Sequence, residues 1–285
     1  MAIIDFFLIV TKILVAGFFG FLFMGIIRKL AARFQNRIGP PIWQPILDFI
    51  KLLSKENIVS KRESPWTNLG PIISLAAYIS VLFLLPIGLH FDFYGSVIWV
   101  IYLLFAGVGG YIIAGFASGN PYSGIGGSRE LVQAFGFELP FIISLLVPTL
   151  KLLSIASSWF YVYPFAFVAF LIAVQGELAL PPFHIPDAEQ ELVAGVFTEL
   201  SGWRLGLFEL AYAFKIFVLS SLISILFLGG GSFFAVLLKD FFVIIFLALI
   251  RVLFARMTID RSLKFFWFVA TPLALIGLVR VLFLM

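Results

Sequence analysis

The amino-acid sequence predicts an all-α integral membrane protein, a bundle of eight transmembrane helices with one amphipathic helix on the cytoplasmic side. Apolar residues make up 62% of the 285 residues and charged residues only 12%, whereas a soluble domain carries about 25% charged residues. The mean hydropathy is +1.13. One soluble core cannot bury so much apolar surface, so we expect residues 1–285 to form a single membrane domain.

Eight apolar segments are long enough to cross a bilayer, which requires about 20 residues of helix. The N-terminal segment has neither a basic stretch nor a small-residue cleavage site, so we interpret it as a retained span rather than a signal peptide. The expected spans cover residues 4–27, 68–89, 93–117, 130–150, 157–179, 204–228, 231–250 and 264–284.

Basic residues are distributed unevenly between the loops, and this bias predicts the orientation. The loops after spans 2, 4 and 6 contain only Lys151. Cytoplasmic loops carry the excess of Lys and Arg, so we expect the odd-numbered loops in the cytoplasm and both termini outside. The basic residues of the odd-numbered loops are Arg28, Lys29, Arg33, Arg37, Lys51, Lys55, Lys61, Arg62, Arg129, Arg204, Arg251, Arg256, Arg261 and Lys264.

The composition also limits the cofactors and partners. The chain has no cysteine and only two histidines, His90 and His184, which are far apart in the sequence. Iron–sulfur clusters, thiolate zinc sites and disulfides are therefore excluded. We expect no cofactor in this chain and place any redox centre in other chains. The net charge of +4 reflects topology rather than nucleic-acid binding, because about half of the basic residues flank spans.

The first cytoplasmic loop contains a predicted amphipathic helix at residues 44–55. Its polar residues Gln44, Asp48, Lys51 and Lys55 are spaced by four, three and four positions, so they share one face. Pro45 suits the first turn, where no N–H partner is needed. Two interpretations stay open: a strut on the membrane surface, or part of a docking platform for a cytoplasmic partner.

Acidic residues within the spans are the main candidates for function, because a charge near the bilayer centre costs about 2.5–3.5 kcal/mol and faces the bundle interior. We interpret them as a proton relay that includes a tyrosine. The alternative is a set of ion pairs that only fix helix packing. The candidate relay consists of Arg129 and Glu130, which open the fourth span, Glu138, Glu177, Glu209 and Tyr212, with Asp187, Glu189 and Glu191 in the following loop.

The loop at residues 180–203 is acidic yet partly apolar. Pro181, Pro182 and Pro186 prevent a continuous helix. A rigid, half-buried loop at the mouth of a membrane bundle indicates a site rather than a linker.

Four ordered blocks of residues, which extend over nearly the whole chain, resemble the subunit 1 family of respiratory complex I, the NADH–quinone oxidoreductase of bacteria and mitochondria. They also resemble its relatives in energy-converting membrane-bound hydrogenases. The blocks are QNRIGPP at 35–41 with QPILD at 44–48; SRE at 128–130 with FELP at 137–140; Glu177 with PFHIPDAE at 182–189 and ELVAG at 191–195; and SG at 201–202 with Arg204 and LF at 207–208.

The resemblance implies a tilted helical bundle in a prokaryotic cell membrane, with a cavity and a path of buried charges. The path would comprise Glu138, Glu177, Asp187, Glu189 and Glu191, with Arg129 as a nearby base. The implied partners are peripheral cluster-bearing chains, chains like the hydrogenase large subunit, antiporter-like membrane subunits and the lipid bilayer. The residues that we assign to docking are Arg33, Arg37, Gly39, Pro40, Gln44, Asp48, Lys51 and His184.

The departures from the family pattern favour the hydrogenase-type relatives. The stretch between Gly39 and Gln44 is short, whereas quinone-reactive members usually carry a longer one. Ala179 and Leu180 replace the usual Asn-Arg pair before Pro-Phe, and His184 replaces an Asp. Lys215 stands where a neutral polar residue is usual, and a usual glutamate falls at Tyr212.

Our leading hypothesis is therefore a non-catalytic coupling subunit of a ferredoxin-linked complex, of the membrane-bound hydrogenase or sulfur reductase type, that moves protons or sodium ions. The runner-up is the quinone-binding subunit of a dehydrogenase that oxidises NADH or F420H2. A secondary transporter is disfavoured because the sequence has no internal repeat. A purely structural anchor remains open.

Overall fold

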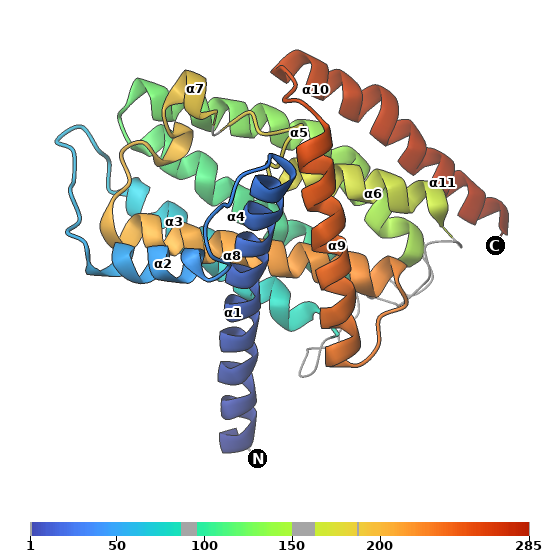
Figure 1. The fold of residues 1–285 in the computed structure, drawn as a ribbon. Coiled ribbons are helices and arrows are strands. Elements are labelled where there is room, and N and C mark those ends of the chain that lie inside the picture. Colours follow the sequence, from blue (N-terminus) through green and yellow to red (C-terminus); the bar gives the residue numbers. More distant parts are fainter. Residues whose placement is uncertain (1, 87–95, 150–162, 187, 285) are drawn as a thin grey trace.

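The computed structural model describes residues 2–86, 96–149, 163–186 and 188–284, which form helices joined by turns and loops (Figure 1). The helices are α1 Ala2–Phe34, α2 Gln44–Ser54, α3 Trp66–Leu84, α4 Ser96–Ala117, α5 Pro121–Thr149, α6 Pro164–Glu177, α7 Glu189–Leu192, η1 Gly195–Phe197, α8 Gly202–Phe227, α9 Phe233–Leu253, α10 Ile259–Phe265, the π-helical turn η2 Phe266–Ala270, and α11 Thr271–Leu284.

The predicted all-α membrane fold is confirmed. Among the described residues, seven helices are long and apolar enough to cross a membrane: α1, α3, α4, α5, α8, α9 and the continuous run over Ile259–Phe283. The fifth predicted span, 157–179, corresponds to α6, an apolar helix of 14 residues. The first part of that span, 157–162, lies outside the described residues. Helix α2 occupies the segment for which the sequence predicts an amphipathic helix.

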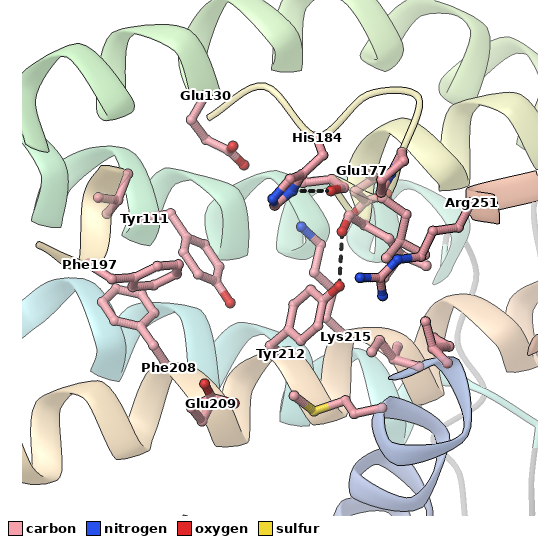
Figure 2. Close-up of a pocket in the computed structure, with 18 of the residues that line it drawn as sticks. Tyr111, Glu130, Glu177, His184, Phe197, Phe208, Glu209, Tyr212, Lys215 and Arg251 are labelled. Atoms are coloured by element: carbon pink, nitrogen blue, oxygen red, sulfur yellow. Dashed lines mark hydrogen bonds between the residues drawn. The ribbon is translucent and has the colours of Figure 1, made fainter. Parts of the chain in front are cut away.

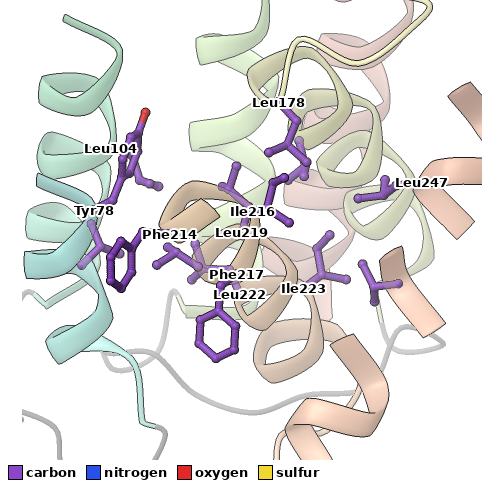
Figure 3. Close-up of a cluster of buried hydrophobic side chains, with 14 of the residues drawn as sticks. Tyr78, Leu104, Leu178, Phe214, Ile216, Phe217, Leu219, Leu222, Ile223 and Leu247 are labelled. Atoms are coloured by element: carbon purple, nitrogen blue, oxygen red, sulfur yellow. The ribbon is translucent and has the colours of Figure 1, made fainter. Parts of the chain in front are cut away.

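Helix α8 lies at the centre of the bundle. Its most apolar 18-residue window is 89% buried, against 28% for the window in Ile259–Phe283. Figure 3 shows α8 with α3 and α4 on one side and α6 and α9 on the other, with apolar side chains of the buried core between them. Two charged side chains of this helix, Arg204 and Lys215, are also buried.

Glycines allow the helices around α8 to approach closely. A Cβ at Gly20 of α1 would lie 2.2 Å from the carbonyl oxygen of Ala213 on α8. A Cβ at Gly110 of α4 would lie 2.5 Å from the carbonyl oxygen of Gly70 on α3. Small residues at such crossings are how membrane helices gain contact, since lipid offers no hydrophobic driving force for association.

The start of α5 differs from the prediction. The helix begins at Pro121, where the side-chain oxygen of Asn120 accepts a hydrogen bond from the Tyr122 N–H (2.9 Å), and proline is favoured in a first turn. The glycine-rich segment after Tyr122 is typical of a loop. Its glycines instead allow close packing, because a Cβ at Gly126 would lie 2.9 Å from the Cα atom of Gly195.

One further expectation about a helix boundary is corrected. Arg129 and Glu130 were expected to open the fourth span, but they lie inside α5 because that helix starts nine residues earlier. Lys239 and Asp240 lie within α9, which is continuous over Phe233–Leu253. Both side chains form hydrogen bonds with residues of α8 or of the turn between α8 and α9.

Candidate functional site

A cavity of about 300 Å³ lies against the central helix α8 (Figure 2). Helices α1, α4, α5, α6 and α9 and the segments around residues 178–184 and 196–197 complete its wall. The residues that line it are Met24, Ile27, Arg28, Tyr111, Glu130, Glu177, Leu178, Ala179, Leu180, Pro181, His184, Val196, Phe197, Leu205, Phe208, Glu209, Tyr212, Lys215, Ile216 and Arg251.

Three of the predicted relay carboxylates line this cavity. Glu130 on α5 and Glu177 at the end of α6 are buried, and Glu209 on α8 is half-buried. Glu130 lies within the regular helix α5 and on its buried side. The Gln133 side chain then donates to the Gly176 carbonyl oxygen (2.9 Å), which joins α5 to the end of α6 beside Glu177. Three helices distant in sequence therefore bring their carboxylates to one space.

Lys215 supplies a positive charge inside the bundle. Its side chain on α8 is 3% exposed, and its ammonium nitrogen lies 5.8 Å from the Tyr78 ring centre and 5.6 Å from the Tyr111 ring centre. It interacts electrostatically with both Glu130 and Glu177. Figure 2 shows the amine pointing toward the part of the cavity where Glu177 and His184 lie. Aromatic faces and carboxylates together stabilise a cation where water is scarce.

Glu177 has an incomplete set of hydrogen bonds. Its side chain is 2% exposed, and its Oε1 atom accepts no hydrogen bond from the described residues. A buried carboxylate oxygen without a donor is costly unless it carries a proton or meets water. The group is thus suited to gain and release a proton within the cavity.

A short non-helical segment forms the wall of the cavity beside Glu177. The Tyr212 hydroxyl donates to the Leu178 carbonyl oxygen (3.0 Å), and the His184 ring nitrogen Nδ1 lies 2.9 Å from the Ala179 carbonyl oxygen (Figure 2). The Gln175 amide donates to the Pro181 carbonyl oxygen (2.7 Å). These contacts hold the segment at the end of α6, and they place His184, which we assigned to docking, at the cavity.

Aromatic rings form a second, apolar part of the wall. The Tyr111 and Phe208 rings are stacked with centres 4.6 Å apart, and Phe197 lies edge-on to both at 5.9 and 5.5 Å. This part of the wall is apolar, whereas the carboxylates give the other part a polar surface. The cavity is therefore amphipathic, with room for a few waters or a small planar group.

The remaining relay candidates lie elsewhere. Glu138 is half-buried on α5 and does not line the cavity. Asp187 lies outside the described residues, and the structure describes only the backbone of Glu189, at the start of α7.

The carboxylate of Glu191 lies at the surface between two guanidinium groups. One carboxylate oxygen lies 2.6 Å from a guanidinium nitrogen of Arg129, and the other lies 2.6 Å from one of Arg256. The hydrogen bond from Arg129, followed by the charge of Arg256, lowers the pKa of Glu191 below its ordinary value. A carboxylate held in the charged form is an anchor, and Arg129 acts there rather than beside the cavity.

The other docking candidates lie around α2 and the preceding loop. Arg33, Arg37 and Lys51 are exposed, and Gly39 and Pro40 are partly exposed.

The polar face of α2 is joined to α1. The Gln44 amide donates to Asp48 (3.0 Å), and Asp48 pairs with Arg28 of α1 (3.4 Å). Because Arg28 also lines the cavity, this pair connects the exposed polar face of α2 to the candidate site.

One buried ion pair was missed by the sequence reasoning. Arg204 was counted as a topogenic loop charge, but its side chain is 0% exposed and forms a salt bridge with Glu63. It also donates to the Asn57 side chain (2.7 Å) and to the Ile58 carbonyl oxygen (2.8 Å). These bonds fix the loop after α2 to the start of α8. No spacing in the sequence relates residues about 140 positions apart.

Lys215 was also left out of the candidate site. The sequence does contain a signal, because a lysine deep in a span is costly. Glu209, six residues earlier on the same helix, is poorly placed to pair with Lys215, and the carboxylates that interact with it come from α5 and α6. No group of three or more His, Asp or Glu residues that could hold a metal is found within the ranges that the structure describes.

Comparisons with known proteins agree on one family. The family model described as NADH dehydrogenase matches residues 6–282. A subunit of the NADH-quinone oxidoreductase of Bacillus cytotoxicus is 36% identical over 90% of this chain and 87% of its own length, and the same subunit of Bacillus thuringiensis is 35% identical with the same coverage. A chain in the structure of the membrane-bound sulfane sulfur reductase, an archaeal respiratory membrane complex, is 31% identical with a TM-score of 0.87, covering 97% of this chain and 99% of that one.

Proposed function

This chain belongs to the NADH dehydrogenase family, which comprises the complex I subunit 1 proteins, and from this premise we propose that it couples electron transfer in partner subunits to ion movement through its cavity. The relatives are named as parts of an oxidoreductase and of a respiratory membrane complex. A subunit without its own redox centre contributes by responding to redox events next to it. The response requires groups that change charge inside the membrane.

The observation that carries this proposal is the grouping of Glu130, Glu177 and Lys215 in one membrane-embedded cavity. Ionisable residues in spans are costly, and they mark ion pathways and proton relays. Glu177 lacks a donor at one oxygen, while Lys215 supplies charge to it and to Glu130. Adding or removing one proton changes the electrostatic energy of all three residues, because their charges interact in a medium of low dielectric constant.

The finer proposal is a ferredoxin-linked complex of the sulfur reductase or hydrogenase type. It is supported by the full-length likeness to a chain of the sulfane sulfur reductase and by the short stretch between Gly39 and Gln44. Peripheral cluster-bearing chains would dock at α2 and the basic loop, with Arg33, Arg37 and Lys51 exposed to them. Antiporter-like subunits would adjoin the bundle in a prokaryotic cell membrane, with the loop that carries α2 in the cytoplasm. The translocated ion would be H⁺ or Na⁺.

The test compares Glu177→Gln with Glu191→Gln in the purified complex, reconstituted into vesicles. Glutamine keeps the size of the side chain and removes its ability to carry a proton. We expect Glu177→Gln to assemble, to keep electron transfer to a soluble acceptor, and to lose ion translocation. Glu191→Gln is the matched control, because its carboxylate lies at the surface, and it should translocate normally.

Two results would contradict the proposal. Normal ion translocation by Glu177→Gln would show that this carboxylate only fixes packing. Equal loss in Glu177→Gln and Glu191→Gln would show that neither effect comes from the cavity. Subunits that co-purify with the chain, identified by mass spectrometry, test the finer assignment. Two intact Cys-x-x-Cys pairs in the large peripheral subunit indicate a hydrogenase, and one lost pair indicates a sulfur-reducing or other non-hydrogenase complex.

A quinone-binding subunit is the second candidate function. The observation that favours it is the stacked wall of Tyr111, Phe208 and Phe197, which presents flat apolar faces to the cavity. The 36% identical relative is named as part of a quinone oxidoreductase. Quinone retained by the purified complex, and a photoreactive quinone that labels this wall, would support this candidate over the first.

A further inference from the structure

A second buried carboxylate lies between α8 and α9, outside the cavity. The side chain of Asp240 on α9 is 0% exposed. Its Oδ2 atom accepts a hydrogen bond from Ser221 (2.7 Å) and its Oδ1 atom accepts one from Ser224 (2.5 Å), both on α8. None of the three residues lines the cavity.

The site lies toward the opposite end of the helices from the cavity. Asp240 precedes the cavity residue Arg251 by eleven positions on α9, which is about 16 Å of helix. Ser224 follows the cavity residue Lys215 by nine positions on α8, which is about 13 Å. The two groups of ionisable residues are thus separate in depth, and α8 carries both.

Asp240 has no cationic partner among the residues that the structure describes. Within the described ranges, no Lys, Arg or His nitrogen forms a salt bridge with it. Lys239, the next residue, donates to the carbonyl oxygens of Leu228 and Gly230 in the turn between α8 and α9 (2.7 and 2.6 Å).

Two lysines within the spans that pack against α9 lie over aromatic rings. Lys12 of α1 lies over the Phe83 ring, and Lys215 of α8 lies over the Tyr78 and Tyr111 rings. A carboxylate with two hydroxyl donors and no counter-charge is strongly disfavoured in a membrane interior.

We propose that Asp240, Ser221 and Ser224 form a proton-binding site, in which the carboxyl group is held as the neutral acid and exchanges its proton during turnover. One O–H bond forms or breaks at the Asp240 carboxyl group, and no electron moves. In the neutral acid, one carboxyl oxygen carries the proton and donates to one serine hydroxyl, while the other oxygen accepts from the second serine, so both contacts are kept without a net charge. The direct hydroxyl–carboxyl contacts leave no gap between these oxygens for a metal cation.

The route for the proton leads to the turn between α8 and α9. Asp240 is seven residues from the start of α9, about 10 Å of helix. Gly229, Gly230 and Gly231 all have positive φ, a conformation that glycine adopts without strain. The Lys239 amine donates to carbonyl oxygens of this turn. We therefore place the proton route at this polar, glycine-rich turn, which follows the end of α8 away from the cavity.

Infrared spectroscopy of the purified complex tests the protonation. A neutral carboxylic acid has a C=O band that is distinct from carboxylate bands and shifts in D₂O. We expect Asp240→Asn to remove one such band, and Ser221→Ala or Ser224→Ala to shift it. Ser220→Ala is the matched control, because the Ser220 hydroxyl is buried on the same helix but donates to the Phe217 carbonyl oxygen (2.9 Å). Its spectrum should match that of the wild type in this region.

Proton exchange is tested by translocation in vesicles. We expect Asp240→Asn to assemble, because asparagine resembles the neutral acid in shape, and to lower the number of protons moved per electron. An unchanged ratio would overturn the exchange role and leave a packing bond between helices. If Asp240→Asn removes a carboxylate band instead of an acid band, Asp240 is ionised and the proposal of a neutral acid is overturned. If the wild type loses the acid band in Na⁺ buffer but not in K⁺ buffer, the site binds Na⁺ and the proposal is overturned as well.

The spectra of the serine variants also decide the question if Asp240→Asn fails to assemble. An acid band that neither serine variant shifts would overturn the proposal. The infrared result does not depend on the cavity, so the proposal can stand or fall independently of the Glu177→Gln experiment.

Discussion

Glu177 and Glu191 are fourteen residues apart and were expected to serve one relay, yet the structure gives them opposite surroundings. Glu177 is 2% exposed at the end of α6, with one oxygen that accepts no hydrogen bond from the described residues. Glu191 is a surface carboxylate clamped by Arg129 and Arg256. The first is suited to change its charge and the second to keep it. Residue type alone therefore does not identify a proton carrier, whereas the groups within hydrogen-bonding distance do.

The largest effect is expected at Lys215, the buried cation that interacts with Glu177. Glu191 pairs instead with arginines at the surface. Lys215→Met keeps the volume and removes the charge that Glu130 and Glu177 share. We expect ion translocation to slow on the order of a hundredfold, in the range that one positioned proton-transfer group contributes. Stopped-flow measurement of vesicle acidification gives the rate.

Lys12→Met is the control for this prediction. Lys12 is also a lysine within a span, but it lies in α1 over the Phe83 ring and does not line the cavity. We expect a rate close to that of the wild type. If both variants slow translocation to the same degree, the effect reflects membrane lysines in general rather than the cavity.

The next effect concerns stability and compares a buried arginine with a surface one. Arg204→Met leaves Glu63 buried without its partner, and breaking a buried pair costs about 3–5 kcal/mol. Arg129→Met breaks the exposed pair with Glu191 and should cost at most about 1 kcal/mol. The difference is measured by heating the purified complex and recording the temperature at which this chain is released from it. Equal shifts in the two variants would rule out a structural role for the Arg204 pair.

The smallest effect is the pH dependence of the Glu191 cluster. Arg129 first, and then Arg256, lower the pKa of Glu191 in the folded protein below its unfolded value of 4.5. The cluster therefore adds stability above the unfolded pKa, and this stability is lost as the pH falls through the folded pKa. Solvent screens the exposed groups, so the change is small.

The measurement is the unfolding temperature of the wild type and of Glu191→Gln between neutral pH and about pH 3, a range that includes the ordinary glutamate pKa. We expect the two curves to converge at the acidic end and the wild type to be slightly more stable near neutrality. A difference that grows as the pH falls would contradict the assignment.

Much of the fold could be predicted from the sequence. The apolar segments correspond to α1, α3, α4, α5, α8, α9 and the C-terminal run. The helical spacing of polar residues over 44–55 predicted α2. These are local properties, because bilayer thickness fixes the length of a span and helical periodicity fixes its polar face. The ordered motifs also identified the family, since they depend on the chain alone.

The candidate site could be predicted only in part. The sequence named Glu130, Glu177 and Glu209 as candidates, but it also named Glu191 and placed His184 in a docking loop. It missed the partners of Lys215 and the buried pair of Arg204 altogether.

The tertiary structure decided which ionisable groups meet. The packing of α5 places Glu130 on its buried side, and the central position of α8 brings Lys215 to Glu177 on one side and places Ser221 and Ser224 against Asp240 at its other end. These pairings join helices that are distant in sequence, and they depend on how each helix is rotated and how deep it lies. Packing sets rotation and depth through close contacts such as that of Gly20 with Ala213, which no local pattern encodes.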